Sequence, residues 1–166
     1  MSPLRTTVHH SPVGPLRLVA GPQGLRELAF VQRPHAASAG HAGSSDDAAF
    51  HEVREQLDRY FSGELRRFDL PLDPVGTPFQ LRVWEALHAL PYGATISYGE
   101  LARRLGTPRA ARAVGLANGR NPLPILVPCH RVVGADGRLT GYSGGLARKT
   151  YLLELERRAA GVPSVA

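Results

Sequence analysis

Residues 121–133 read Asn-Pro-Leu-Pro-Ile-Leu-Val-Pro-Cys-His-Arg-Val-Val and contain the only cysteine of the 166-residue chain, Cys129. The three prolines of this stretch exclude a regular helix, because each lacks a backbone N–H and restricts the residue before it. The apolar run 125–127 leads directly into Pro128 and Cys129. We therefore expect a short, stiff, buried segment that presents a nucleophile beside a potential base, His130.

In most proteins a lone cysteine is a small buried hydrophobic residue. Here the neighbours of Cys129 favour a reactive thiolate, because His130 is adjacent and Arg131 adds positive charge. Consecutive residues of a strand point to opposite faces. Cys129 and His130 can therefore cooperate only if the chain turns at this point or a water molecule bridges them. The surrounding prolines favour such a turn.

The length of the chain fits one domain or two small domains with a buried core. The best boundary is the segment 73–76, where composition and charge change. Residues 1–73 carry eight arginines and nine acidic residues, a net charge of −1, whereas residues 74–166 carry twelve basic and five acidic residues, a net charge of +7. We predict domains at 1–73 and 74–166. The charge of the second domain favours a polyanionic partner.

Several protein classes are disfavoured by the composition. No apolar run is long enough to span a membrane, and the first ten residues lack the apolar core of a signal peptide. A single cysteine excludes an intramolecular disulfide and fits a reducing cytoplasm. The seven histidines lack ligand spacing, so no metal site is expected.

The first half of the chain has an α+β pattern. Strand-like runs at 6–10, 16–20 and 25–30, separated by glycine and proline turns, predict a β-meander. Residues 33–47 lack periodicity and predict a surface loop. A helix is then predicted by apolar residues at helical spacing, namely Ala49, Val53, Leu57 and Phe61, with Gly63 ending it. Residues 66–72 have an extended pattern. No catalytic residue is visible in this half, which we expect to support the other.

The second half begins with a helix signal. Thr77-Pro78-Phe79-Gln80 matches a capping box with proline in the first turn. The apolar stripe that follows consists of Phe79, Val83, Leu87 and Leu90. Trp84 is accordingly predicted to be a core residue.

Two shorter helices follow. Residues 97–100 match a second capping box, and Thr107-Pro108 predicts the start of a third helix over 109–118. Helix, tight turn and helix in so short a span form the helix-turn-helix pattern. The third helix alternates arginines with very small residues, which allows close approach to a nucleic-acid backbone. Taken alone, the same pattern fits a tightly packed helix with solvated arginines equally well.

Pro128-Cys129-His130-Arg131-Val132, preceded by Asn121-Pro122 and followed by Tyr142-Ser143-Gly144-Gly145-Leu146, resembles the active-site signature of the O6-alkylguanine-DNA alkyltransferases. The resemblance extends from about residue 77 to residue 156. It implies an α+β N-terminal domain, a small sheet plus helix that is ribonuclease-H-like, followed by a mostly α winged helix-turn-helix C-terminal domain.

Glu156 lies on the face of the predicted last helix, 146–158, that carries Leu152 and Leu153. A carboxylate on an apolar stripe needs a partner to offset the loss of its hydration. A histidine would serve, and the resemblance implies that the partner is His130. A glutamate reaching to the surface is the alternative.

The resemblance also implies a function, the repair of O6-alkylguanine, mainly O6-methylguanine, in DNA by a single irreversible alkyl transfer without cofactor or metal. Cys129 would be the nucleophile and His130 the base, acting through a water. Glu156 would orient His130, Asn121 would stabilise the turn that shapes the site, and Tyr142 would protonate the leaving base. The implied walls of the base pocket are Pro124, Val132, Tyr142, Ser143 and Gly144.

By the same resemblance the partner is double-stranded DNA, bound through the minor groove by a monomer that can bind cooperatively. Arg112 would fill the space of the extruded nucleotide and Tyr98 would help to push it out, since an atom inside a stacked duplex is reached only by flipping. Further implied DNA contacts are Ala111, Ala113, Gly115, Asn118 and Arg131. Asn118 departs from the bulkier apolar residue that is frequent in the family.

Two other classes fit part of the pattern. A cysteine hydrolase would also use cysteine, histidine and a carboxylate, but it has no need of a basic helix-turn-helix. A winged-helix protein that only recognises the lesion or an operator would need the helices, but relatives that recognise alkylguanine without repairing it lack the cysteine. Cys129 therefore favours repair.

Overall fold

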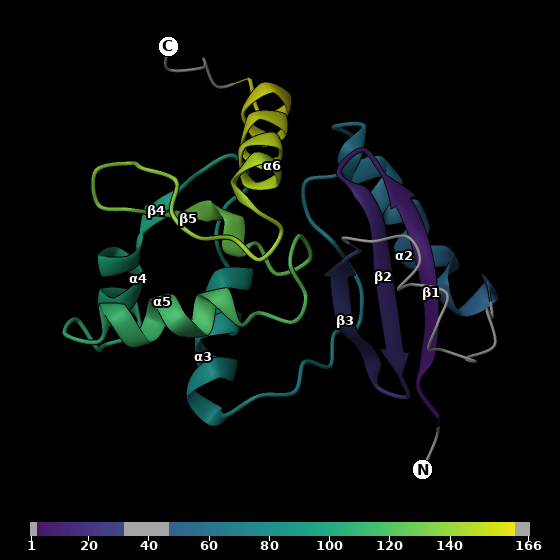
Figure 1. Cartoon of the computed structure of the whole chain (residues 1–166), viewed down its shortest axis with the longest axis horizontal. Coiled ribbons are helices and arrows are strands. Elements are labelled where there is room, and N and C mark those ends of the chain that lie inside the picture. The colour runs from purple at the N-terminus through teal and green to yellow at the C-terminus, as the bar shows by residue number, and fades with distance from the viewer. Residues whose placement is uncertain (1–2, 32–46, 162–166) are drawn as a thin grey trace. The chain divides into compact units, whose positions relative to one another are not determined.

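The computed structural model describes residues 3–31 and 47–161. The chain divides into two compact units, Met1–Val75 and Gly76–Ala166. Figure 1 shows a sheet and a long helix in the first unit and a group of shorter helices in the second. Among the described residues, no helix is both long and apolar enough to cross a membrane.

The first unit contains the predicted meander. Strands β1 (Arg5–Ser11), β2 (Gly14–Gly21) and β3 (Gly24–Phe30) pair antiparallel in the order β1-β2-β3, which confirms the prediction. Leu16 and Leu18 of the central strand alternate onto one face and are fully buried. That face is covered by helix α2 (Asp47–Phe61) (Figure 1). The predicted loop 33–47 lies outside the described residues, except for Asp47 at the start of α2.

The apolar stripe of α2 differs from the prediction in its phase. Its buried residues are Phe50, Val53, Leu57 and Tyr60, whereas Ala49 is exposed and Phe61 is half-buried. Both ends of the helix carry adjacent apolar residues, and the observed rotation buries Phe50 in place of the much smaller Ala49. The segment 66–72, predicted to be extended, is irregular apart from one isolated bridge between Leu72 and Leu25.

The described part of the second unit, residues 76–161, contains four α-helices and one short parallel strand pair. The helices are α3 (Pro78–His88), α4 (Tyr98–Arg104), α5 (Ala111–Gly119) and α6 (Leu146–Ala159). Strands β4 (Ile96–Ser97) and β5 (Val132–Val133) pair in parallel. Helices α4 and α5 pack together as the predicted helix-turn-helix.

The helix starts follow their capping residues only in part. Thr77 forms the full predicted capping box with Gln80. Ser97 caps α4, but the carboxylate of Glu100 pairs with arginines in the next turn of α4, so the second capping box is incomplete. The prediction that the third helix starts at residue 109 is wrong. The Ala110 N–H donates to Thr107 O at 2.9 Å and closes a turn, after which α5 begins at Ala111.

Trp84 is a core residue, as predicted, since only 3 % of its surface is exposed. Its indole N–H donates to Ala117 O at 2.9 Å and thereby joins α3 to α5. Of the predicted stripe, Val83, Leu87 and Leu90 are buried, while Phe79 is half-buried. The Trp84 ring also lies against Gly76, where a Cβ atom would come within 2.5 Å of it.

Gly76→Ala should therefore destabilise the protein by about 1–3 kcal/mol, because the rigid indole has to move away from the new methyl group. The matched control is Gly99→Ala in α4, where a Cβ atom meets nothing closer than 3.9 Å. We expect that control to change the stability by no more than about 0.5 kcal/mol. Denaturant unfolding measures both variants, and equal stabilities would contradict the packing of Trp84 on Gly76.

Candidate active site

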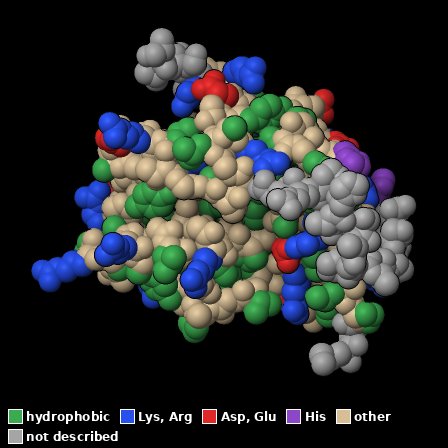
Figure 2. Space-filling model, in the orientation of Figure 1, with side chains coloured by type: hydrophobic (Ala, Val, Ile, Leu, Met, Phe, Trp, Pro, Cys, Tyr) green, Lys and Arg blue, Asp and Glu red, His purple; other side chains and the backbone are tan. Residues whose placement is uncertain are grey.

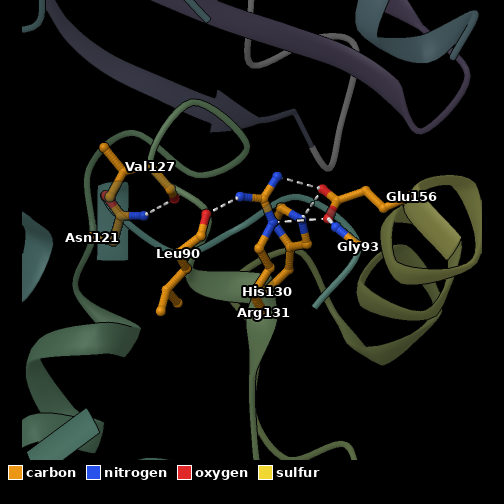
Figure 3. Close-up of polar contacts among 7 residues, drawn as sticks. All are labelled: Leu90, Gly93, Asn121, Val127, His130, Arg131 and Glu156. Atoms are coloured by element: carbon orange, nitrogen blue, oxygen red, sulfur yellow. Dashed lines mark hydrogen bonds and ion pairs between the residues drawn. The ribbon is translucent and has the colours of Figure 1, made fainter. Parts of the chain in front are cut away.

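Asn121 fixes the loop that leads to Cys129. Its side-chain Oδ1 accepts the Leu123 N–H at 3.0 Å. Its Nδ2 donates to Val127 O at 2.8 Å, as Figure 3 shows. The Val127 N–H closes the same loop by donating to Leu123 O at 2.8 Å. Ile125, at the centre of the loop, is buried and has a φ of 75°, a left-handed conformation that a β-branched residue adopts only under constraint. Asn121 thus stabilises this turn, as expected.

The chain turns at Cys129, as cooperation with His130 requires. Pro128 has φ −80° and ψ 66°, the geometry of an inverse γ-turn, and the Cys129 N–H donates to Val127 O at 2.8 Å. A single 3-10 turn, η1 (Cys129–Arg131), follows directly. Successive side chains of a 3-10 helix point about 120° apart. The three consecutive side chains therefore enter three different environments.

The Cys129 thiol is buried, with 4 % of the residue exposed. Burial raises the pKa of Cys129 to about 11, while a hydrogen bond from Asn121 and the positive charge of Lys149 act in the opposite direction. The free protein therefore holds Cys129 as a thiol at neutral pH. The expectation that His130 and Arg131 would favour a thiolate is wrong, because burial outweighs the groups that lower the pKa of Cys129, and the charge of Arg131 is paired with Glu156.

His130 and Glu156 form the predicted contact. His130 Nε2 lies 2.6 Å from Glu156 Oε2, and both side chains are essentially unexposed. Burial lowers the pKa of His130 below its ordinary value, so the ring is neutral at physiological pH. It then donates through Nε2–H to the carboxylate. The other nitrogen, Nδ1, is buried and has no hydrogen-bond partner among the described protein atoms, which leaves it able to accept a proton.

Arg131 lies inside the unit, and its position does not fit the expected role in DNA contact. Its Nε and Nη2 donate to the two oxygens of Glu156 at 2.8 and 3.0 Å, and its Nη1 donates to Leu90 O at 2.8 Å (Figure 3). Its guanidinium also lies 5.5 Å from the centre of the Tyr92 ring. Although burial acts to raise it, the pKa of Glu156 is held well below its usual range by His130 and Arg131. Glu156 is therefore charged.

Lys149 is a site residue that no sequence motif indicated. It is fully buried in α6, and its Nζ donates to Val132 O at 2.7 Å and Thr140 O at 2.8 Å. Burial lowers the pKa of Lys149, and the neighbouring Cys129 acts to raise it. One feature of the sequence could have drawn attention to it, since it is the only lysine among 20 lysines and arginines. The ammonium group of lysine is compact, and the broader, planar guanidinium of arginine would not fill the same buried position.

The glycine-rich loop, residues 141–145, lies close enough to Cys129 for Tyr142 and Cys129 to interact electrostatically. Burial raises the pKa of Tyr142 well above its ordinary value, and the neighbouring Glu156 and Cys129 act in the same direction, so the hydroxyl keeps its proton. Of the other predicted pocket residues, Pro124, Val132 and Gly144 are buried, whereas Ser143 is exposed. The hydroxyl of Tyr98 accepts a hydrogen bond from Thr140 at 3.2 Å, which ties the start of α4 to this loop.

The predicted DNA contacts on α5 divide into two groups. Arg112 and Ala113 are exposed, and Ala111 and Gly115 are partly exposed. Asn118 instead faces the interior, with 4 % of its surface exposed and its Oδ1 buried without a hydrogen-bond partner among the described residues. Its side chain is therefore not part of the exposed surface of the helix.

Comparison with known proteins assigns both units. Residues 78–158 match the family described as "6-O-methylguanine DNA methyltransferase, DNA binding domain", and residues 4–74 match its "ribonuclease-like domain". A methylated-DNA–protein-cysteine methyltransferase of Mycobacterium bovis is 53% identical over 150 residues, which are 90% of each chain.

Solved structures agree with this assignment. The crystal structure of Mycobacterium tuberculosis O6-methylguanine methyltransferase matches with a TM-score of 0.84 and 48% identity, covering 98% of this chain and 97% of that one. A structure of Mycobacterium tuberculosis OGT in complex with DNA matches with a TM-score of 0.82 and 51% identity, covering 97% of this chain and 95% of that one. The chain therefore belongs to the 6-O-methylguanine DNA methyltransferase family.

Proposed function

We infer that this protein repairs O6-alkylguanine in DNA, mainly O6-methylguanine, by irreversible transfer of the alkyl group to Cys129. Its relatives at about half identity are named methylated-DNA–protein-cysteine methyltransferases. The observation that carries the inference is a buried thiol followed directly by a neutral histidine whose far nitrogen is held by a charged glutamate. This arrangement supplies a nucleophile, a proton acceptor and an orienting group.

In the proposed reaction, Cys129 Sγ attacks the saturated alkyl carbon and forms a C–S bond. The bond from that carbon to O6 of guanine breaks, and its electron pair leaves with the base. The thiol proton passes to His130 Nδ1, through a bridging water, because the free thiol is protonated and Nδ1 is the unoccupied side of a neutral ring. The product thioether is stable, so each molecule acts once.

The leaving guanine anion needs a proton, and Tyr142 is the proposed donor. Its raised pKa keeps the hydroxyl protonated in the free protein, so that a proton is present when the guanine anion forms. Tyr142 is then reprotonated from His130 through solvent, so the guanine has gained one proton and both His130 and Tyr142 return to their starting forms. Asn121 and Lys149 stabilise the negative charge that develops on sulfur, since both lower the pKa of Cys129.

The burial of the Cys129 thiol supports nucleotide flipping. With 4 % of its surface exposed, Cys129 cannot reach an atom that remains inside a base stack. We propose that α5 binds the minor groove, that Arg112 occupies the space of the extruded nucleotide and that Tyr98 assists the extrusion. Ala111, Ala113 and Gly115 permit the close approach. The protein acts as a monomer in a reducing, cytoplasmic compartment, where Cys129 stays a free thiol.

Mixing the protein with an equimolar duplex that contains O6-methylguanine should add one methylene unit of mass to the Cys129 peptide. Intact-protein and peptide mass spectrometry measures this gain, and an unmodified duplex is the control. Cys129→Ala should abolish transfer while lesion binding largely survives, since the substitution removes only the nucleophile. Transfer by the Cys129→Ala protein would refute the assignment.

The transfer rate should be nearly independent of pH from about pH 7 to about pH 9, because neutral His130 takes the proton during the attack. The rate should fall at lower pH, where His130 becomes protonated. The free base O6-methylguanine is the substrate for this measurement, so that DNA binding does not contribute. A rise of about tenfold per pH unit across this range would instead indicate reaction of a pre-formed thiolate below a pKa of about 11.

Glu156→Gln should destabilise the protein by about 3–5 kcal/mol, because it leaves the buried Arg131 charge unpaired. It should also slow transfer, because His130 loses its charged partner. The matched control on the same helix is Glu154→Gln, which breaks a part-exposed pair with Arg157 and should cost less than about 1 kcal/mol. Chemical denaturation and the single-turnover rate provide the two readouts. Equal effects of the two substitutions would contradict a special role for Glu156.

A further inference from the structure

One row of exposed side chains on α5 consists of Arg112, Leu116 and Arg120, which we call the α5 row. Its members are four residues apart, so they follow one another along one side of the helix and its C-terminal cap. All three are exposed, and 60 % of Leu116 is accessible. Figure 2 shows basic and apolar side chains next to one another over this helix.

Leu116 is unlike its surroundings on α5. The other residues of the exposed side are very small, namely Ala113, Gly115 and Gly119, while Val114 and Ala117 fill the core side. A single exposed leucine is ordinary on a protein surface. This leucine, however, lies between two exposed arginines on a helix without any acidic residue, within a half of the chain that carries a net charge of +7. A polyanion that binds both arginines would therefore contact Leu116.

The position of Leu116 next to Gly115 connects it to the proposed site of flipping. The Tyr98 ring lies against Gly115, where a Cβ atom would be 3.5 Å from Cδ1 of the ring. Tyr98 in turn holds the glycine-rich loop through its hydrogen bond with Thr140. Leu116 is therefore the first large side chain along α5 after Arg112 and Gly115, on the side that faces solvent.

We propose that Leu116 packs against the deoxyribose edges of the minor groove beside the extruded nucleotide, while Arg120 contacts a phosphate. The proposal rests on the proposed function, because it takes duplex DNA as the occupant of α5. The sugar edges are the apolar part of the groove wall, and minor-groove proteins are known to place apolar side chains, leucine among them, inside this groove. The contact supplies affinity that does not depend on salt, since no counterion is released when an apolar group binds.

The test compares Leu116→Ala, Arg120→Ala and Leu81→Ala in the full-length protein. Leu81 is the matched control, an exposed leucine on α3 outside the α5 row, with 39 % of its surface accessible. Binding to a duplex with and without O6-methylguanine is measured by fluorescence anisotropy over a series of salt concentrations. Leu116→Ala should weaken binding about fivefold at every salt concentration, as expected for a partly buried leucine. Arg120→Ala should lower the salt slope by about one.

Transfer kinetics separate this contact from the chemistry. For Leu116→Ala, the rate on duplex DNA at subsaturating concentration should fall relative to the rate on the free base O6-methylguanine. Thermal melting of all variants checks that the fold is retained. Affinity equal to that of the wild type, an equal loss in Leu81→Ala, or a changed salt slope in Leu116→Ala would each overturn the proposal.

The proposed function fails separately, if the wild type binds the lesion duplex but gains no methylene unit on Cys129. In that case the affinity comparison still decides the role of Leu116. A wild type that binds no duplex at all would overturn both.

Discussion

The buried carboxylate of Glu156 is the interaction on which the active site depends. Burying a charge costs several kcal/mol unless partners satisfy it. Here Arg131 donates twice, His130 donates at 2.6 Å and the Gly93 N–H lies at 3.3 Å. Together these contacts join α6, the 3-10 turn and the segment after α3. The same carboxylate fixes the ring of His130 with Nδ1 free to take a proton. One charged group thus stabilises the second unit and orients its base.

The sequence predicted which residues belong to this site better than it predicted their burial and their hydrogen-bond partners. Helical periodicity placed Glu156 on the apolar face of the last helix, and the prolines around Cys129 predicted a turn. Arg131 was misplaced because an arginine beside a reactive cysteine is ordinarily a surface or activating charge. Its burial follows from the 3-10 turn, which directs three consecutive side chains about 120° apart. Such a turn has no periodic signature. The role of Lys149 depends on two carbonyl groups, at Val132 and Thr140, that only the folded chain brings together.

In the fold, too, the features set by local sequence were predicted, whereas those set by tertiary packing were not. The meander, the Thr77 capping box and the core position of Trp84 were predicted, because turns, caps and apolar periodicity are local properties. The start of α5 was not, because Thr107-Pro108 satisfies a turn as well as it would satisfy a helix start. The phase of α2 was also wrong. Ala49 and Phe50 are apolar neighbours, and only the packing of α2 against the sheet, mainly against β1, decides which of them is buried.

A raised thiol pKa is consistent with a protein that can react only once. A thiolate that exists before the substrate arrives would react with any small electrophile or oxidant, and each such event would remove a molecule permanently. Burial keeps Cys129 protonated, with a pKa of about 11. His130 is the proposed acceptor of that proton, and the groups that stabilise charge on sulfur, Asn121 and Lys149, are already in place. Reactivity is thereby restricted to the moment when an alkyl carbon is held against the sulfur, and the restriction arises from burial, the same factor that requires the nucleotide to be flipped.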